Sequence, residues 1–285
     1  MDEPRDDDWG AHAPTYDRLY APLTGHVGRT MVTMTEARLP EHAQVLDIAT
    51  GSGALVRPAI ERAARRRRTG GRDFVIGSDF SPGMVEVARH NVATLDAAAF
   101  RLEVQDGQAL SYEDAAFDAA YSCFGIFLFE DRAAGWREAA RVVKPGGLFA
   151  TSTWMPPERN EMFRVQFGPA IAALPPRLQP ESGGPPPGWM VVADPTALQA
   201  EVEAAGFEDV EVVPFTTQFA IPNAAAAWDA MLDNPGAGVL LRQCDAHELQ
   251  AVKEAYLGHL GARVSGPDRP LLLEAACNIL TARRG

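Results

Sequence analysis

The sequence predicts an α/β protein built on a doubly wound, mostly parallel sheet of seven strands. From residue 44 to residue 154, short apolar runs alternate with segments whose apolar residues recur at helical spacing. Several runs are apolar almost throughout, as strands buried on both faces require. Because the connections are short, this alternation indicates parallel strands with helices on both faces of the sheet.

The core elements follow in chain order. Five strands are expected over residues 43–49, 73–79, 100–106, 117–124 and 147–154. Helices are expected over residues 53–68, 81–95 and 132–144. Ser81 can cap the second of these helices, and Pro82 suits its first position, where a backbone N–H would have no partner.

The remaining segments are predicted to extend this core and to cap it. Before the core, the chain has an acidic start and a loosely helical segment. Beyond the core, we expect a proline- and glycine-rich loop or flexible lid over 174–189, a helix over 194–207, a strand over 208–221, helices over 223–262 and a last strand over 269–284. The extra helices would form a cap inserted before the last strand. We therefore expect one domain overall, made of an N-terminal segment over 1–43, a core over 44–154 and the rest of the sheet with its cap over 155–285.

Composition excludes several classes of partner. The 285 residues are 46% apolar, enough for a packed core, and carry a net charge of −12, which argues against a nucleic-acid surface. The three cysteines form no CxxC pair and indicate neither a disulfide framework nor a metal site. The N-terminus lacks the apolar stretch of a signal peptide, and no run has transmembrane length. We expect a cytoplasmic protein with no membrane partner.

Three carboxylates follow three successive predicted strands, namely Asp47, Asp79 and Asp106. In a parallel sheet, ligands bind beyond the carboxyl ends of the strands, where the strand order reverses. Asp79 is placed to accept both hydroxyls of a ribose, and Asp106 could accept from an adenine amino group. These strand ends therefore predict a nucleoside-binding site.

The loop VLDIATGSG after the first strand has only part of a dinucleotide-binding pattern. Ala49 and Val56 occupy the outer glycine positions, and Asp47 would repel a pyrophosphate. An amino-acid moiety with a positive ammonium suits Asp47 instead, while Gly51 and Gly53 let the backbone approach closely. An adenosine with a cationic amino-acid tail is S-adenosylmethionine (SAM), which becomes S-adenosylhomocysteine (SAH) when it loses its methyl group.

Five segments in order, VLDIATGSG, GSDFSPGMVEVAR, VQDGQAL, FDAAYSCFGIFLFED and EAARVVKPGGLFATSTW, resemble a class I SAM-dependent methyltransferase of the ubiquinone/menaquinone-biosynthesis type. The resemblance implies that fold, a small-molecule acceptor and an N-terminal lid over the cofactor. Phe80 and Met84 would pack against the adenine, and Cys123 would lie beside the methionine moiety. Ala49 departs from the family, which more often has glycine there. The expected cofactor contacts are Tyr20, Asp47, Ala49, Thr50, Gly51, Gly53, Asp79, Phe80, Met84, Asp106, Gly107, Gln108 and Cys123.

The end of the fourth strand suits an apolar acceptor. Ser122-Cys123-Phe124-Gly125 stands there, whereas methyltransferases acting on base amines tend to have an acid or Asn followed by Pro-Pro-Tyr. A quinone-, phenol- or polyketide-like metabolite methylated at oxygen or carbon fits this apolar end. The candidate substrate contacts are Tyr16, Phe124, Phe127, Trp154 and Met155, although core packing explains Phe127, Trp154 and Met155 equally well.

Methyl transfer from a sulfonium is an in-line displacement, which needs alignment and exclusion of water rather than a protein nucleophile. A general base helps when the acceptor is a hydroxyl or an acidic carbon, and His12 in the lid segment is the candidate.

Three other functions stay open at this point. An NAD(P)-dependent oxidoreductase is disfavoured by Asp47 and the missing glycines. A SAM-binding protein that catalyses another reaction, such as a cyclisation, and a regulatory SAM-binding module are the other two. The sequence also leaves the oligomeric state open, a homodimer included.

Overall fold

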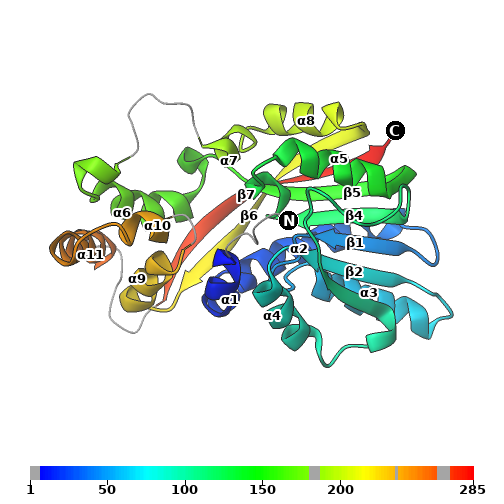
Figure 1. Cartoon of the computed structure of the whole chain (residues 1–285), viewed down its shortest axis with the longest axis horizontal. Coiled ribbons are helices and arrows are strands. Elements are labelled where there is room, and N and C mark those ends of the chain that lie inside the picture. Colours follow the sequence, from blue (N-terminus) through cyan, green and yellow to red (C-terminus); the bar gives the residue numbers. More distant parts are fainter. Residues whose placement is uncertain (1–6, 180–186, 235–236, 262–269) are drawn as a thin grey trace, which may run out of the picture.

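The computed structural model describes residues 7–179, 187–234, 237–261 and 270–285. Seven strands form one sheet in the order β3-β2-β1-β4-β5-β7-β6 (Figure 1). Their bounds are β1 Gln44–Ile48, β2 Phe74–Asp79, β3 Phe100–Val104, β4 Phe117–Cys123, β5 Val143–Trp154, β6 Phe207–Ile221 and β7 Leu271–Arg284. Every strand predicted from the sequence is present.

Five neighbouring strands, β3, β2, β1, β4 and β5, run parallel. Strand β7 is antiparallel to both of its neighbours, β5 and β6. The sheet is therefore mixed: it is mostly parallel, as expected from the sequence, and antiparallel at its last two pairings. The apolar pattern of a strand reports burial but not direction, so nothing in the sequence of β7 signals the reversal.

Eleven α-helices lie in the described part of the chain: α1 Asp8–Leu19, α2 Ala21–Thr35, α3 Val56–Arg68, α4 Pro82–Val92, α5 Arg132–Val142, α6 Gly168–Ala172, α7 Gly188–Val191, α8 Pro195–Ala204, α9 Ala224–Leu232, α10 Ala237–Leu241 and α11 Ala246–Gly261. Short 3₁₀ turns are η1 Glu36–Arg38, η2 Ala97–Ala99, η3 Ile126–Leu128, η4 Pro157–Arg159 and η6 Pro176–Leu178, and a π-helix, η5, covers Phe163–Phe167. Ser81 caps α4 as predicted, because its Oγ accepts from the Met84 N–H at 3.0 Å and Pro82 takes the first position.

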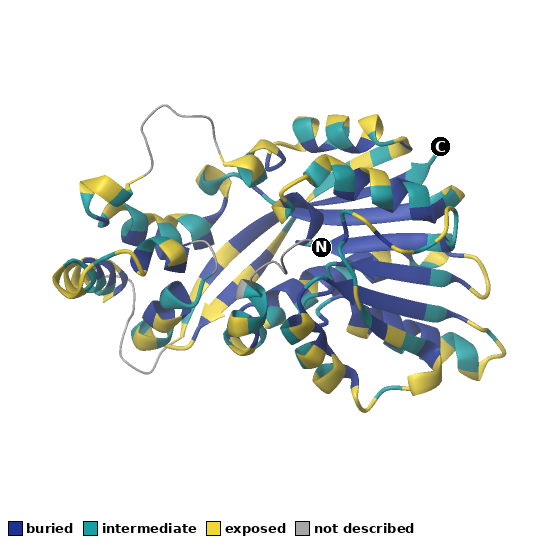
Figure 2. Cartoon of the chain, viewed as in Figure 1, coloured by how far each residue is buried: buried dark blue, intermediate teal, exposed yellow. Residues whose placement is uncertain are grey.

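Helices cover the parallel strands on both faces. The chain runs from β1 through α3 to β2 and through α4 to β3, always in one direction along the sheet. From β4 through α5 to β5 it runs in the opposite direction. Since such crossovers are right-handed, α5 lies on the face opposite to α3 and α4. The central strands are dark blue, and therefore buried, almost throughout in Figure 2, which explains why their sequences are apolar on both sides.

Strands β6 and β7 form a ribbon that projects beyond the carboxyl end of β5. The β5 pairing with β7 stops at Trp154 opposite Cys277, whereas β6 stays paired with β7 as far as Leu271. The projecting half carries a second apolar cluster, which we call the cap cluster. It is formed by the end of α1 and the start of α2 with η5, α6, α9, α10, α11 and the projecting ribbon. In Figure 1 the helices α6, α9, α10 and α11 gather at the left.

The cap therefore comes from two insertions, one between β5 and β6 and one between β6 and β7. The proline- and glycine-rich stretch predicted as a loop lies partly outside the described residues, which omit 180–186. In the part of the chain that the structure describes, no helix has both the length and the apolar character needed to cross a bilayer.

Candidate functional site

The strand order reverses between β1 and β4, because the chain moves outward to β2 and β3 on one side and to β5 on the other. Open α/β sheets bind ligands in the crevice beyond the carboxyl ends at such a point. The loops after β1 and β4 meet there, since a Cβ placed on Gly125 would lie 2.5 Å from the Cβ of Ala49. The predicted site and the topology thus point to the same edge of the sheet.

The loop after β1 has the left-handed conformation at three residues, Ala49 (φ 56°), Gly51 (φ 56°) and Gly53 (φ 100°). The Thr50 N–H donates to the Ser78 carbonyl at 2.8 Å and ties the loop to β2. A Cβ placed on Gly51 would meet no atom within 4 Å. The loop therefore exposes its backbone to open space, as close approach of a ligand requires.

Ala49 stands at a backbone angle that favours glycine, which gives its departure from the family a physical consequence. Left-handed alanine is strained by roughly 1–2 kcal/mol, and glycine would relieve this strain. Glycine also gives the unfolded chain more conformational freedom, which offsets part of the gain in stability. We therefore expect Ala49→Gly to raise the free energy of unfolding by about 0.5–1 kcal/mol. Urea denaturation measures the change. Ala115→Gly is the matched control, since Ala115 also has a positive φ (54°) in another turn. A gain at Ala115 without one at Ala49 would contradict strain in the loop.

Asp47, the residue before the last one of β1, is a fully buried carboxylate. Its Oδ2 accepts from Thr50 Oγ1 at 2.7 Å, whereas its Oδ1 has no hydrogen-bond partner among the described residues. Burial raises the pKa of Asp47 to about 7, and the charge of Asp79 contributes to this rise while the Thr50 hydrogen bond opposes it. An unpaired buried carboxylate oxygen calls for a donor, and a ligand ammonium fits that need.

Asp79 joins the first two strand-end loops. Its Oδ2 accepts from the Gly51 N–H at 2.8 Å and its Oδ1 from the Ser81 N–H at 3.0 Å. Burial raises the pKa of Asp79 to about 6, these backbone hydrogen bonds oppose the rise, and the charge of Asp7 adds to it. Each oxygen keeps a second lone pair with which it can accept a ligand hydroxyl.

The raised pKa values of Asp47 and Asp79 predict a pH dependence of stability. In the folded protein without ligand, Asp47 and Asp79 keep protons that the same residues of the unfolded chain release near pH 4. The extra protons stabilise the folded state. This contribution to the free energy of unfolding is complete below about pH 4 and is lost as the pH rises to about 7. Asp47→Asn should remove its share, which reaches about 1.4 kcal/mol per pH unit at most. Urea denaturation from pH 5 to pH 8 should therefore show the variant gaining stability relative to wild type as the pH rises. A constant difference would contradict the raised pKa.

The end of β3 is tied to the start of α5. Asp106 Oδ1 accepts from the Gln108 N–H at 2.9 Å, and Gln108 Oε1 accepts from the Asp131 N–H at 2.8 Å. A Cβ on Gly107 would lie 2.6 Å from the Phe129 ring, so only glycine fits there. Phe80, directly after β2, is half-buried, and Met84, in the first turn of α4, is buried.

The end of β4 leads into an aromatic wall. Phe124 adopts a left-handed conformation (φ 56°), and its N–H donates to Ser152 Oγ at 3.1 Å. Its ring stacks on Trp154 at 4.0 Å, and Trp154 in turn meets the edge of Phe163 at 5.7 Å. Strained residues of this kind concentrate at functional sites. Cys123 donates to the Thr24 carbonyl at 3.5 Å, and burial raises its pKa, so the thiol is neutral.

Two predicted substrate residues belong mainly to the packing around this wall. Phe127 is buried in the main core, with its ring 6.5 Å from that of Phe124. Met155 is buried where β5 ends, and its N–H donates to the Ala276 carbonyl at 3.1 Å.

Helix α1, which belongs to the segment expected to form a lid, packs on α4. Asp7 caps this helix by accepting from the Gly10 N–H at 2.8 Å, and its other oxygen accepts from the Gly83 N–H of α4 at 3.2 Å. A Cβ on Gly83 would lie 2.5 Å from the Gly10 Cα, so the two helices touch through glycines. Asp17 accepts from Asn91 Nδ2 at 2.7 Å. The sequence analysis missed Asp7, because an acidic N-terminus carries no sign of a partner 76 residues away.

The lid places its predicted residues at different depths. Tyr16 stands near the strand ends, where burial and the nearby Cys123 and Asp79 raise its pKa. Tyr20 stacks between Tyr16 at 5.6 Å and Phe219 at 5.3 Å and belongs to the cap cluster. His12 is half-buried on α1, and its ring forms no hydrogen bond within the described ranges.

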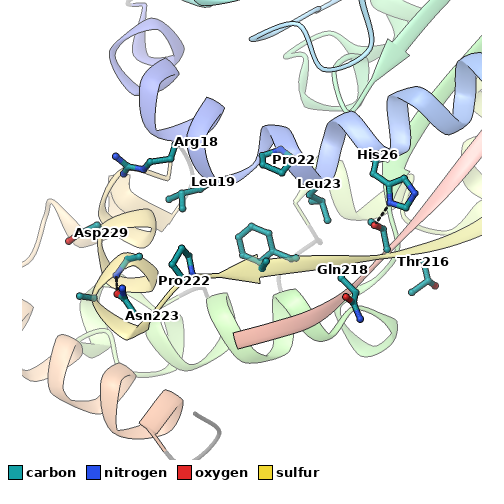
Figure 3. Close-up of a pocket in the computed structure, with 15 residues that line it drawn as sticks. Arg18, Leu19, Pro22, Leu23, His26, Thr216, Gln218, Pro222, Asn223 and Asp229 are labelled. Atoms are coloured by element: carbon teal, nitrogen blue, oxygen red, sulfur yellow. Dashed lines mark hydrogen bonds between the residues drawn. The ribbon is translucent and has the colours of Figure 1, made fainter. Parts of the chain in front are cut away.

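A separate groove of about 900 Å³ runs along the edge strand β6. Figure 3 shows it between the α1–α2 segment and β6, with Arg18, Leu19 and Pro22 on one side and Pro222 and Asn223 on the other. None of the residues predicted for the site lines it. We therefore place the candidate site at the strand ends, where the buried carboxylates and the aromatic wall meet.

These features define an α/β protein with a site for a nucleoside that carries a cationic amino-acid tail. A family model described as a methyltransferase domain matches residues 45–147. The demethylmenaquinone methyltransferase of Thermus thermophilus is 31% identical over 205 residues, which cover 68% of this chain and 89% of that protein. The demethylmenaquinone methyltransferase of Corynebacterium kroppenstedtii is 37% identical over 144 residues, or 50% of this chain and 56% of that protein.

Two further comparisons extend this result. The aklanonic acid methyltransferase DauC of a Streptomyces species is 27% identical over 177 residues, which cover 59% of this chain and 76% of that protein. A solved structure of a proposed methyltransferase from Bacillus halodurans covers 88% of this chain and 96% of its own, with a TM-score of 0.53 at 17% identity, and shows the same fold.

The chain belongs to the class I SAM-dependent methyltransferases of the UbiE and demethylmenaquinone methyltransferase type. The match to the Corynebacterium relative spans little more than half of that protein's length.

Proposed function

We propose that this protein transfers a methyl group from SAM to an oxygen or carbon atom of an apolar or aromatic small molecule. The observation that carries the proposal is the pair of buried carboxylates, Asp47 and Asp79. They lie around an open glycine loop at the place where the strand order of the sheet reverses. An ammonium and a ribose supply what these two carboxylates need, namely donors in a buried setting.

The proposed cofactor contacts extend from this pair. Asp47 Oδ1 holds the ammonium, and the loop backbone with Ala49, Thr50, Gly51 and Gly53 follows the amino-acid moiety. Asp79 accepts the ribose hydroxyls. Asp106, Gly107 and Gln108 line the edge of the adenine, between Phe80 and Met84, and Cys123 lies beside the sulfur. The cofactor supplies a methyl group bonded to a sulfonium, which makes the group transferable without a protein nucleophile.

The proposed acceptor site lies between the lid and the aromatic wall. Tyr16 on the lid stands near Cys123 at the end of β4, and Phe124 and Trp154 stack next to that strand end, so we place a flat apolar acceptor among these rings. Two relatives are named for the methylation of demethylmenaquinone and of aklanonic acid, which supports a quinone- or polyketide-like acceptor here. The net charge of −12 supports a small molecule over a nucleic acid.

The protein's own groups position the reactants and exclude water in this proposal. Helix α1, held by Asp7 on α4, covers the strand ends, and the cap covers the acceptor side. The residues of 1–43 thus act as the lid and those of 155–285 supply the cap. Where the acceptor atom must lose a proton, His12 on the lid is the proposed base. The free cysteines support a reducing, cytoplasmic setting.

SAH release tests the proposal. The protein is incubated with SAM and, one at a time, with phenols, quinols and polyketide-like aromatics under anaerobic conditions, and SAH and product masses are followed by mass spectrometry. We expect SAH in equal amount to a product heavier by one methylene for at least one acceptor. Tight binding of SAM without SAH from any acceptor would instead favour a non-methylating reaction, and binding of NADH in place of SAM would contradict the cofactor.

A further inference from the structure

Four buried polar atoms in the cap cluster have no hydrogen-bond partner within the described residues. They are the hydroxyl oxygens of Tyr20 and Tyr256 and both side-chain atoms, Oε1 and Nε2, of Gln166. Tyr20 and Tyr256 are buried members of the cap cluster, and Gln166 is buried between Val165 and Phe167, which pack in the same cluster. Buried polar groups in native proteins are almost always paired, so a group of unpaired ones needs a partner from outside the chain.

These groups come from three separate segments that meet in the cap cluster. Tyr20 joins α1 to α2, Gln166 lies in the π-helix η5, and Tyr256 lies in α11. The side chains of Asn234 and Gln166 lie near the Tyr20 hydroxyl, and both oppose the rise in the pKa of Tyr20 that burial causes. Tyr20 also adds to the raised pKa of Tyr256, which places the two hydroxyls in one neighbourhood. A π-helix inside a helical segment is rare and is frequent at functional sites.

Two aromatic rows connect this polar group with the ends of the strands. On the lid, Tyr20 stacks on Tyr16, which stands beside Cys123 and Asp79. On the sheet side, Phe163 of η5 meets Trp154 at the end of β5. A molecule lying between the rows would have its reacting end at the strand ends and its far end at Gln166.

We propose, resting on the methyltransferase function above, that Gln166, Tyr20 and Tyr256 bind a neutral carbonyl or hydroxyl oxygen at the far end of the aromatic acceptor. An amide and two phenols offer both donors and acceptors, so they pair with either kind of oxygen. Asp233 is the charged group that acts on the Tyr20 hydroxyl, and its negative charge disfavours an acceptor carboxylate at this place. The polar group thus selects oxygenated rings over plain hydrocarbons of the same shape.

The test compares two probes on the whole protein saturated with SAH. Calorimetry measures the affinities of 1,4-dihydroxynaphthalene, kept reduced, and of naphthalene, which has the same rings without the oxygens. The wild type should prefer the diol by roughly tenfold to a hundredfold, since a site built for hydrogen bonds rejects an analogue that lacks them. Gln166→Leu, and separately Tyr20→Phe, should reduce this preference to less than about threefold, and Gln166→Leu should leave the SAH affinity unchanged.

Control variants separate recognition from folding. Tyr256→Phe removes a single oxygen and should lower the preference in a fold that is left intact. Gln250→Leu on the exposed face of α11 is the matched glutamine control and should keep the wild-type preference. Wild-type preference retained in both Gln166→Leu and Tyr20→Phe would overturn the inference and leave these groups to buried water. A wild-type protein that binds neither probe would instead contradict the aromatic acceptor of the proposed function.

Discussion

Replacing Asp79 by alanine should weaken SAM binding by about 1.5–3 kcal/mol, or roughly tenfold to 150-fold, the scale of hydrogen bonds to a charged group. The carboxylate holds the Gly51 and Ser81 N–H groups in the described structure, so its loss also loosens the loop that follows β1. Calorimetric titration with SAM and with adenosine measures the effect. Because Asp79 is assigned to the ribose, adenosine should lose as much affinity as SAM.

Two companion variants show whether the loss comes from the ribose. Asp47→Asn should weaken SAM binding but leave adenosine nearly unchanged, since Asp47 is assigned to the ammonium. Asp194→Ala removes a helix-capping carboxylate far along the chain, at the start of α8, and should leave both affinities at the wild-type level. Unchanged SAM affinity in Asp79→Ala would remove Asp79 from the site.

Gly51→Val should abolish measurable SAM binding while the protein stays folded. A Cβ placed on Gly51 would meet no protein atom within 4 Å, so a side chain there starts in the open space that we assign to the ligand. Valine at φ 56° is strained by roughly 1–2 kcal/mol, which is small beside the 5–15 kcal/mol of a typical domain. We expect affinity to fall at least about a hundredfold, because a steric block removes the loop contacts together.

Gly146→Val provides the matched control for this prediction. Gly146 also has a positive φ (72°) and open space around its Cβ position, but it lies near the amino end of β5, away from the ligand edge. Denaturation should show a similar loss of stability in the two variants, and only Gly51→Val should lose SAM. Normal SAM binding by Gly51→Val would show that the loop assignment is wrong.

Local sequence patterns were sufficient to predict the core of the fold. The apolar runs of the five parallel strands and the Ser81-Pro82 start of α4 are decided by burial and by capping within a few residues, and the structure confirms them. The three acidic strand ends could likewise be found, because each lies at or within two residues of the carboxyl end of its strand. Their convergence follows from the geometry of parallel strands alone.

Long-range pairing decided the features that the sequence did not predict. The reversal of β7 depends on its insertion between β5 and β6, and neither its composition nor its alternation records that. Asp7 appeared as one acid among several, although it joins the lid to α4. Ala49 has an ordinary side chain, and only its backbone angle shows that it is strained. Gln166 became informative through the absence of partners in the folded cap.

A crystal structure with SAH bound tests the central claim most directly. The account predicts the ammonium within hydrogen-bond distance of Asp47 Oδ1 and both ribose hydroxyls on Asp79. The sulfur should lie beside Cys123 and face the space between Tyr16 and the Phe124–Trp154 wall. SAH bound in the groove along β6, or bound at the strand ends with its ribose away from Asp79, would contradict the account.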